Sequence, residues 1–156
     1  MSKQAMSLDL LQQLQSRYPQ ALQIAGEGCR QALLVDAQAL LELMQELKTG
    51  ADYRFNLLSN LTAVDYLNYF ELVYHLYSLP LRQSLTVKSR CPAECPEIDS
   101  VVPVWLSADF QEREIYDLLG VRFTGHPHLR RILTPEGFNE HPLRKAYQLT
   151  RRAKGG

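Results

Sequence analysis

The sequence predicts an α+β protein with a small mixed, mainly antiparallel sheet, helices packed on it and an extended, turn-rich C-terminal strap. Apolar residues recur at helical spacing in three segments, and they alternate with polar residues in two neighbouring segments near residue 80. Gly and Pro interrupt the chain every few residues after residue 121. We therefore expect an α+β domain over residues 1–121 and an extended basic strap over residues 122–156.

The first fifty residues predict a helix, a strand and a second helix. Leucines at helical spacing before Pro19 indicate a helix over residues 8–18. The apolar run at 31–36 is typical of a short buried strand. Asp36 stands where it can cap a helix that continues to Gly50, so this strand is expected to lead directly into the helix.

A hairpin is expected in the middle of the chain. Residues 70–77 alternate between apolar and polar types, Leu79-Pro80 predicts a turn, and residues 81–88 resume the alternation. The polar, proline-containing stretch 89–100 predicts an exposed loop, and residues 101–105 predict one more short strand.

A third helix is expected over residues 107–119, and Gly120 is expected to end it. Glu112 falls at the edge of its apolar side, where a carboxylate needs a donor because burying it unpaired would cost several kcal/mol. The downstream arginines are the expected donors of an internal salt bridge. Arg113 and Asp117 lie on the polar side, where they are expected to form a surface pair.

Composition narrows the class of protein. No apolar run approaches the roughly 20 residues that cross a bilayer, and no secretory signal is visible, so a cytosolic location is expected. Three cysteines in 156 residues predict free thiols. Residues 1–121 carry nine basic and fifteen acidic side chains, whereas residues 122–156 carry eight basic and two acidic ones, which predicts an anionic partner for the strap.

The residues that could carry chemistry fit structural roles better. Cys91 and Cys95 do not have the spacing of a zinc or iron–sulfur site. His126 and His141 each precede a proline and are expected to donate hydrogen bonds that hold the strap, rather than to bind metal. Glu112 and Asp117 would lie on different helix faces, and no nucleophile elbow, phosphate loop or dinucleotide fingerprint is present.

One run, EREIYDLLGVRFTGHPHLRRIL at residues 112–133, carries a family resemblance. It closely resembles the signature of the C-type hydrophilic subunit of respiratory complex I, the proton-pumping NADH:quinone oxidoreductase. The signature joins a Glu-Arg-Glu triplet to an acidic residue and two apolar residues, and then to basic and apolar residues at fixed spacing. The matching positions are Glu112, Arg113, Glu114, Asp117, Leu118, Leu119, His126, Arg130, Ile132 and Leu133.

The resemblance implies a subunit of the electron-transport complex that has no catalytic or redox centre of its own. NADH, FMN, the iron–sulfur clusters and quinone would belong to partner subunits. The expected partners are the quinone-site subunit related to hydrogenase large subunits and the neighbouring iron–sulfur subunits. The chain would be peripheral to the inner or plasma membrane, on its cytoplasmic side, and associated with the membrane through the complex.

The resemblance also assigns roles to individual residues. The expected contacts with partner subunits are His126, Arg130, Arg131, His141, Arg144 and Lys145. The expected structural residues are Glu112, Arg113, Glu114, Asp117 and Gly120. The first alternative is the equivalent subunit of a membrane-bound hydrogenase or formate hydrogenlyase. The second, a nucleic-acid-binding module that uses the basic strap, is disfavoured because the strap has few aromatic residues and no recognised motif.

Overall fold

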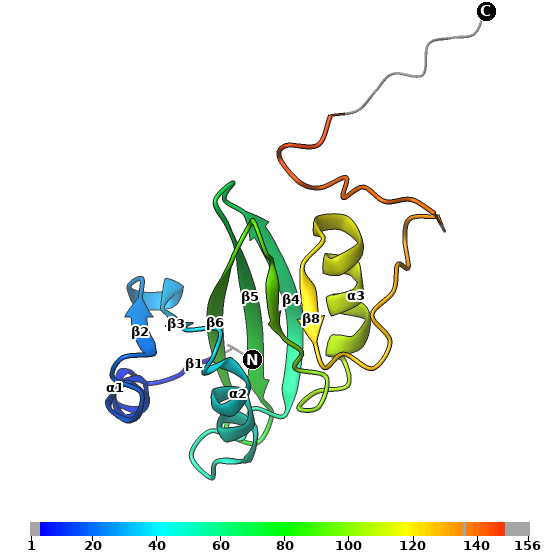
Figure 1. Cartoon of the computed structure of the whole chain (residues 1–156). Coiled ribbons are helices and arrows are strands. Elements are labelled where there is room, and N and C mark those ends of the chain that lie inside the picture. The colour runs from blue at the N-terminus through cyan, green and yellow to red at the C-terminus, as the bar shows by residue number, and fades with distance from the viewer. Residues whose placement is uncertain (1–3, 136, 149–156) are drawn as a thin grey trace, which may run out of the picture.

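The computed structural model describes residues 4–135 and 137–148, apart from the side chain of Cys29, and has the predicted α+β architecture (Figure 1). Its centre is a six-stranded sheet with the order β2-β3-β6-β5-β4, and β1 lies beside β6. The β2–β3, β4–β5 and β5–β6 pairs are antiparallel, whereas β1 and β3 run parallel to β6. The strands are β1 (Gln4–Ala5), β2 (Leu22–Ala25), β3 (Ala32–Val35), β4 (Leu57–Asp65), β5 (Tyr69–Ser78) and β6 (Gln83–Pro92).

Helices pack on this sheet and share one hydrophobic core with it. Their bounds are α1 (Leu8–Arg17), the short 3₁₀ helix η1 (Gly28–Arg30), α2 (Leu40–Thr49) and α3 (Ala108–Leu119). On β5, Phe70, Leu72, Tyr74 and Leu76 are at most 2% exposed, as expected for alternate residues on one covered face of a sheet. The predicted hairpin is thus present as β5 and β6, and the core joins it to all three α-helices.

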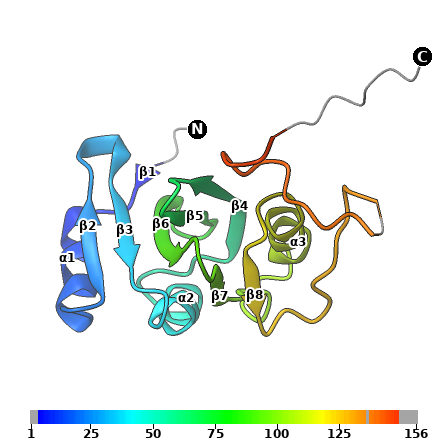
Figure 2. The same ribbon diagram turned by 45° about the horizontal axis from the view of Figure 1, so that its top comes forward.

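Two short strands bracket α3 and hold it beside the main sheet. They are β7 (Glu97–Asp99) and β8 (Arg122–Thr124), which pair in parallel with Ile98 opposite Phe123. The unit β7-α3-β8 lies next to β4 at one side of the molecule (Figure 2). Trp105, just before α3, donates its ring N–H to the carbonyl of Phe55 at 3.0 Å and ties this unit to the segment that enters β4.

Two predicted boundaries differ from the structure in the first half of the chain. The second helix begins at Leu40 with Ala39 at its N-cap position, so the predicted cap at Asp36 is wrong. Residues 36–39 form a turn instead, in which the Ala39 N–H donates to the Asp36 carbonyl at 3.0 Å. The sequence also gave no signal for β2, because its four residues are too few to establish a periodicity.

The region between the hairpin and α3 also differs from the prediction. Strand β6 continues to Pro92, so Cys91 is a buried strand residue and not a loop thiol, and burial raises the pKa of its thiol to about 11. The strand predicted at 101–105 is a turn, in which the N–H groups of Val104 and Trp105 both donate to the carbonyl of Val101. Cys91 and Cys95 are free thiols, while the predicted thiol of Cys29 lies outside the described side chains.

The strap follows β8 and has no helix or strand over its described residues, 125–135 and 137–148. Residues 122–124 are part of β8, so the extended backbone begins at Gly125. The predicted division into two units at residue 122 stays a prediction. Within the part of the chain that the structure describes, no helix has the length and apolarity needed to span a membrane.

Candidate partner interface on the C-terminal end of α3

Asp117, in the last turn of α3, is the anchor of the strap. Its side chain is fully buried, and its Oδ2 accepts three consecutive backbone N–H groups at 3.1, 2.7 and 3.0 Å, those of Ile132, Leu133 and Thr134. Its Oδ1 accepts hydrogen bonds from the Thr134 hydroxyl and, at 2.9 Å, from Nη1 of Arg131. Burial alone would raise the pKa of Asp117, but these hydrogen bonds outweigh it and hold the pKa well below its usual range.

The predicted surface pair between Arg113 and Asp117 is therefore wrong. A helical wheel assigns Asp117 to solvent, but the strap covers this side of α3 and supplies the donors. Arg113 instead lies with its guanidinium carbon 5.3 Å from the centre of the Phe110 ring, and its Nε is 3.4 Å from the carbonyl oxygen of Arg130.

The strap also supplies donors to the carbonyl groups at the end of α3. The last four carbonyls of a helix have no partner within the helix, and cations are favoured there by the helix dipole. In α3 the Tyr116 carbonyl accepts the N–H of Gly120, and the Leu118 carbonyl accepts the N–H of Leu143. The Asp117 carbonyl accepts hydrogen bonds from Arg131 and from Nδ1 of His141. The Leu119 carbonyl accepts a hydrogen bond from Nε of Arg144. The strap thus supplies donors to three of the last four carbonyls, and three of these donors are side chains predicted to contact a partner.

Gly120 ends α3 as predicted, and two separate constraints require glycine there. Its φ of 77° lies in the left-handed region that side chains disfavour. A Cβ at this position would also lie 2.5 Å from Nη2 of Arg144 and 2.7 Å from Nε2 of His141. The close approach of the strap to the helix end therefore depends on the missing side chain.

Glu112 is buried on the other side of α3, and its donors are not the predicted arginines. Oε2 accepts from the hydroxyl of Ser100 at 2.6 Å and Oε1 accepts from the N–H of Val101 at 2.8 Å. The predicted internal salt bridge is wrong, because a neutral hydroxyl and a backbone amide satisfy the carboxyl group instead. Burial raises the pKa of Glu112 to about 7, although the two hydrogen bonds oppose this rise.

Arg131 is used mainly within the chain. Its Nη1 donates to Asp117, to the Thr134 hydroxyl at 3.1 Å and to the Glu140 carbonyl at 3.0 Å, and its guanidinium lies over the ring of Phe138. Arg131 is therefore mostly buried, and its hydrogen bonds hold the strap in its conformation.

His126 fixes the start of the strap. Its ring is fully buried, with Nε2 3.0 Å from Oδ1 of Asp109, at the beginning of α3. Its Nδ1 accepts the N–H of His128 at 3.0 Å, which places the ring proton on Nε2. The two ends of α3 thus hold two separate points of the strap.

Arg130 and Lys145 are the two predicted contact residues with exposed side chains. No carboxylate of the described residues forms an ion pair with either of them. The backbone N–H of Lys145 donates to Oδ2 of Asp65 at 2.8 Å, which fixes the strap against the end of β4. Asp65, Asp109 and Thr134 have no signal in the sequence, because no local pattern joins residues that meet only through tertiary structure.

His126 and His141 contact opposite ends of α3, at Asp109 and at Asp117, so their rings do not converge on one site. Among residues 4–135 and 137–148, no group of three or more His, Cys, Asp and Glu side chains is arranged to hold a metal ion. The expectation that this chain carries no metal or cofactor stays a prediction.

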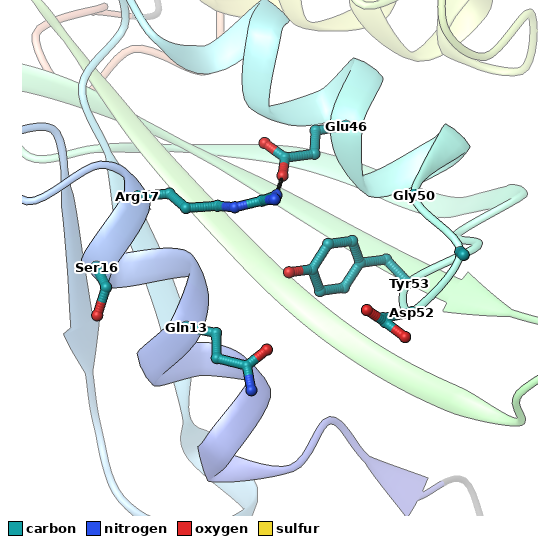
Figure 3. A pocket seen from close by; sticks show the side chains of 8 residues that line it. Gln13, Ser16, Arg17, Glu46, Gly50, Asp52 and Tyr53 are labelled. Carbon is teal, nitrogen blue, oxygen red and sulfur yellow. Dashed lines mark hydrogen bonds and ion pairs between the residues drawn. The ribbon is translucent and has the colours of Figure 1, made fainter.

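A hollow of about 420 Å³ lies between α1 and α2 (Figure 3). An ion pair between Arg17 and Glu46 crosses it, and the hydroxyl of Tyr18 donates to Oε2 of Glu46 at 2.7 Å. The lining residues drawn in the figure hold no pair of groups placed for acid–base or nucleophilic chemistry. We interpret this hollow as a surface depression stabilised by its own ion pair.

Comparison with known proteins identifies the class. Residues 33–153 match the profile of the family described as respiratory-chain NADH dehydrogenase, 30 Kd subunit. The chain therefore belongs to this family, and the predicted resemblance is confirmed.

The relatives are NADH-quinone oxidoreductase C subunits. The protein from Moorella thermoacetica is 44% identical over 143 residues, which cover 90% of this chain and 95% of that protein. The subunit from Geobacter metallireducens is 44% identical over 74% of this chain and 72% of its own length. The subunit from Rhodopseudomonas palustris is 44% identical over 76% of this chain, which spans only 59% of that longer protein.

Two solved structures share the fold. A trypsin-resistant fragment of Nqo5 is 31% identical, with a TM-score of 0.63 over 78% of this chain and 100% of the fragment. A chain of the membrane-bound sulfane sulfur reductase, described as an archaeal respiratory membrane complex, is 25% identical, with a TM-score of 0.75 over 90% of this chain and 85% of that one. The predicted α+β fold with its strap is thus confirmed.

Proposed function

We propose that the chain is a cofactor-free core subunit of the peripheral arm of a proton-translocating NADH:quinone oxidoreductase, where it supports assembly and the quinone-reducing module. The observation that carries this proposal is the strap, which is held in one conformation by the two ends of α3 while part of its surface faces outward. A segment with little apolar content and so many turns gains stability mainly from what it contacts. Because the family is described as a subunit of the respiratory-chain NADH dehydrogenase, we expect these contacts to be with other subunits of such a complex.

The outward side of the strap has the chemistry of a protein interface. Leu133 and Leu143 are 60% and 61% exposed, although their backbone N–H groups are bonded to α3. With Arg130 and Lys145 they form an exposed set of apolar and basic side chains, which we call the outer strap surface. Fixed apolar anchors with charged neighbours suit a partner that offers an apolar patch and carboxylates.

The proposed partners are the quinone-site subunit related to hydrogenase large subunits and the neighbouring iron–sulfur subunits. NADH, FMN, the iron–sulfur clusters and quinone would be bound by those partners. The chain would lie peripheral to the membrane, on its cytoplasmic side, through its place in the complex. The role in a hydrogenase or formate hydrogenlyase is not favoured, because the relatives described above are named as NADH-quinone oxidoreductase subunits.

Affinity purification of the tagged full chain from gently solubilised host membranes tests this proposal. Mass spectrometry is expected to find a quinone-site subunit and iron–sulfur subunits, and metal analysis is expected to find iron without nickel. Nickel with a hydrogenase large subunit would support the alternative role. Recovery of the chain alone would contradict both.

Variants of the outer strap surface locate the contact. Replacing Arg130 and Lys145 with Glu is expected to lower the assembled fraction at least about tenfold, because reversed charges face the partner while the strap keeps its bonds to α3. A matched control replaces Arg30 and Arg82, which are exposed elsewhere, with Glu and changes the net charge equally. Equal assembly of the two double variants would refute the contact.

A further inference from the structure

The outer edge of β4 has backbone groups that the chain leaves available. β4 is the last strand of the main sheet, and α3 lies along its free edge. The N–H of Leu61 donates to Oε1 of Gln111 at 2.6 Å, and the carbonyl of Leu58 accepts from the Ser107 hydroxyl at 3.3 Å. The side chains of Gln111 in α3 and of its N-cap residue Ser107 therefore satisfy the first part of this edge.

The next outward residue on this edge is Ala63. In an antiparallel pair, successive residues alternate between facing the neighbouring strand and facing away from it. Leu61 faces away from β5, and Tyr66 faces it through a hydrogen bond to Tyr69, so Ala63 directs both its N–H and its C=O outward. Among the described residues, no side chain or backbone group outside the sheet bonds to these two groups of Ala63.

A groove of about 280 Å³ runs beside this part of the edge, between β4 and α3. Its walls are mainly apolar on the α3 side, and the strap contributes one wall through Leu143. The lining residues are Asn60, Leu61, Thr62, Ala63, Gln111, Glu114, Ile115, Leu118, Leu119 and Leu143. An apolar groove beside the open N–H and C=O of Ala63 fits an extended peptide, whose main chain can bond to these two groups while a side chain enters the groove.

Glu114 adds a charge to this groove. Its side chain is exposed, and it forms no hydrogen bond or ion pair with any described residue. The other three carboxylates of α3 all have partners. Glu112 is bonded to Ser100, whereas Asp109 and Asp117 contact the strap. An unpaired carboxylate beside an apolar groove is complementary to a Lys or Arg side chain.

We propose that this groove receives an extended segment of a neighbouring subunit, which pairs its main chain with Ala63, places an apolar side chain between β4 and α3, and sets a Lys or Arg beside Glu114. This contact rests on the proposed function, since it requires a complex, and the groove adjoins the outer strap surface at Leu143. Covering the edge would also remove the open strand that an isolated subunit exposes to unwanted pairing.

Photo-crosslinking in the assembled complex tests the proposal. The full chain carries p-benzoylphenylalanine in place of Thr62, which is exposed and lines the groove. We expect a crosslink to one peptide of another subunit that contains an apolar residue next to a Lys or Arg. The matched control carries the same probe in place of Ser16, on the exposed side of α1, and is expected not to capture that peptide.

Other crosslinking results would overturn the proposal. A crosslink between two copies of this chain, a crosslink only within the chain, or no crosslink in a complex that has assembled would each exclude the proposed occupant while leaving the proposed function intact. If no partner subunit co-purifies with the unmodified chain, the proposed function fails and the groove contact fails with it.

Charge reversal gives an independent test. Glu114→Lys is expected to lower the fraction of the chain found in the complex at least about tenfold, and Glu114→Gln less, because a neutral side chain does not repel the basic partner. Glu94→Lys, at another exposed carboxylate, serves as the control and is expected to assemble normally. Assembly of Glu114→Lys at the level of this control, with both chains melting alike, would refute the role of Glu114.

Discussion

Replacing Asp117 with Asn isolates the contribution of one buried charge to the strap. The amide oxygen of Asn can still accept the N–H groups of residues 132–134, but its NH₂ group cannot accept from Arg131. Breaking a buried, hydrogen-bonded ion pair by removing one partner costs about 3–5 kcal/mol. Because Arg131 keeps bonds to two carbonyls and to Thr134, we expect a loss near the lower end of this range, about 3 kcal/mol, in the free energy of unfolding.

Urea unfolding of the full chain measures this loss, with Asp52→Asn as the control at an exposed position that should change stability by less than about 0.5 kcal/mol. Limited trypsin digestion reports the strap itself, because a released strap exposes the bonds after Arg131 and Arg144. If Asp117→Asn unfolds at the same urea concentration as the control and is cut no faster, Asp117 does not anchor the strap.

The pH dependence provides a second measure of the same carboxylate. The pKa of Asp117 is lower in the folded protein than the ordinary value near 4, so the unfolded chain binds the proton first as the pH falls. The stabilisation from Asp117 is therefore fully present above about pH 4 and is lost progressively below it. Asp117→Asn is expected to lose stability less steeply than the natural chain between pH 4 and pH 2.

Glu112 and Gly120 give two further predictions. Burial raises the pKa of Glu112 from 4.5 to about 7, so the folded protein binds the proton more tightly and stability falls as the pH rises through this interval, by about 3 kcal/mol in total. Glu112→Gln should remove this slope and unfold at higher urea than the natural chain at pH 8, and an unchanged slope would refute the assignment. Gly120→Ala should cost at least about 1–3 kcal/mol, because it combines a strained φ with a clash against the strap. A thermal melt checks this, and a melting temperature equal to that of the natural chain would contradict it.

The sequence predicts those elements whose cause is local. The alternation over residues 70–88 and the helical spacing over 107–119 each arise from one face packing on a core, so hairpin and helix are found close to their predicted bounds. The end of the helix at Gly120 is local as well. The signature at residues 112–133 begins in this helix, and the signature indicates the family.

What the sequence could not predict depends on contacts between distant segments. Asp117 has a polar position on the helical wheel, and only the strap, which has no periodicity of its own, makes that position buried. The donors of Glu112 are Ser100, at the end of the predicted exposed loop, and Val101, at the beginning of the predicted strand. The acceptor at Asp65 lies 80 residues before Lys145, and no spacing rule connects them.

The bonds between the strap and α3 have a consequence for the kinetics of assembly. A flexible segment loses about 1–2 kcal/mol of backbone conformational entropy per residue when a partner orders it. Here Asp117 and the end of α3 order residues 131–134 and 141–144 during folding of the chain itself, so docking requires less ordering. Preorganisation of this kind favours binding as a rigid body and a slow dissociation rate, which suits a subunit that stays in its complex.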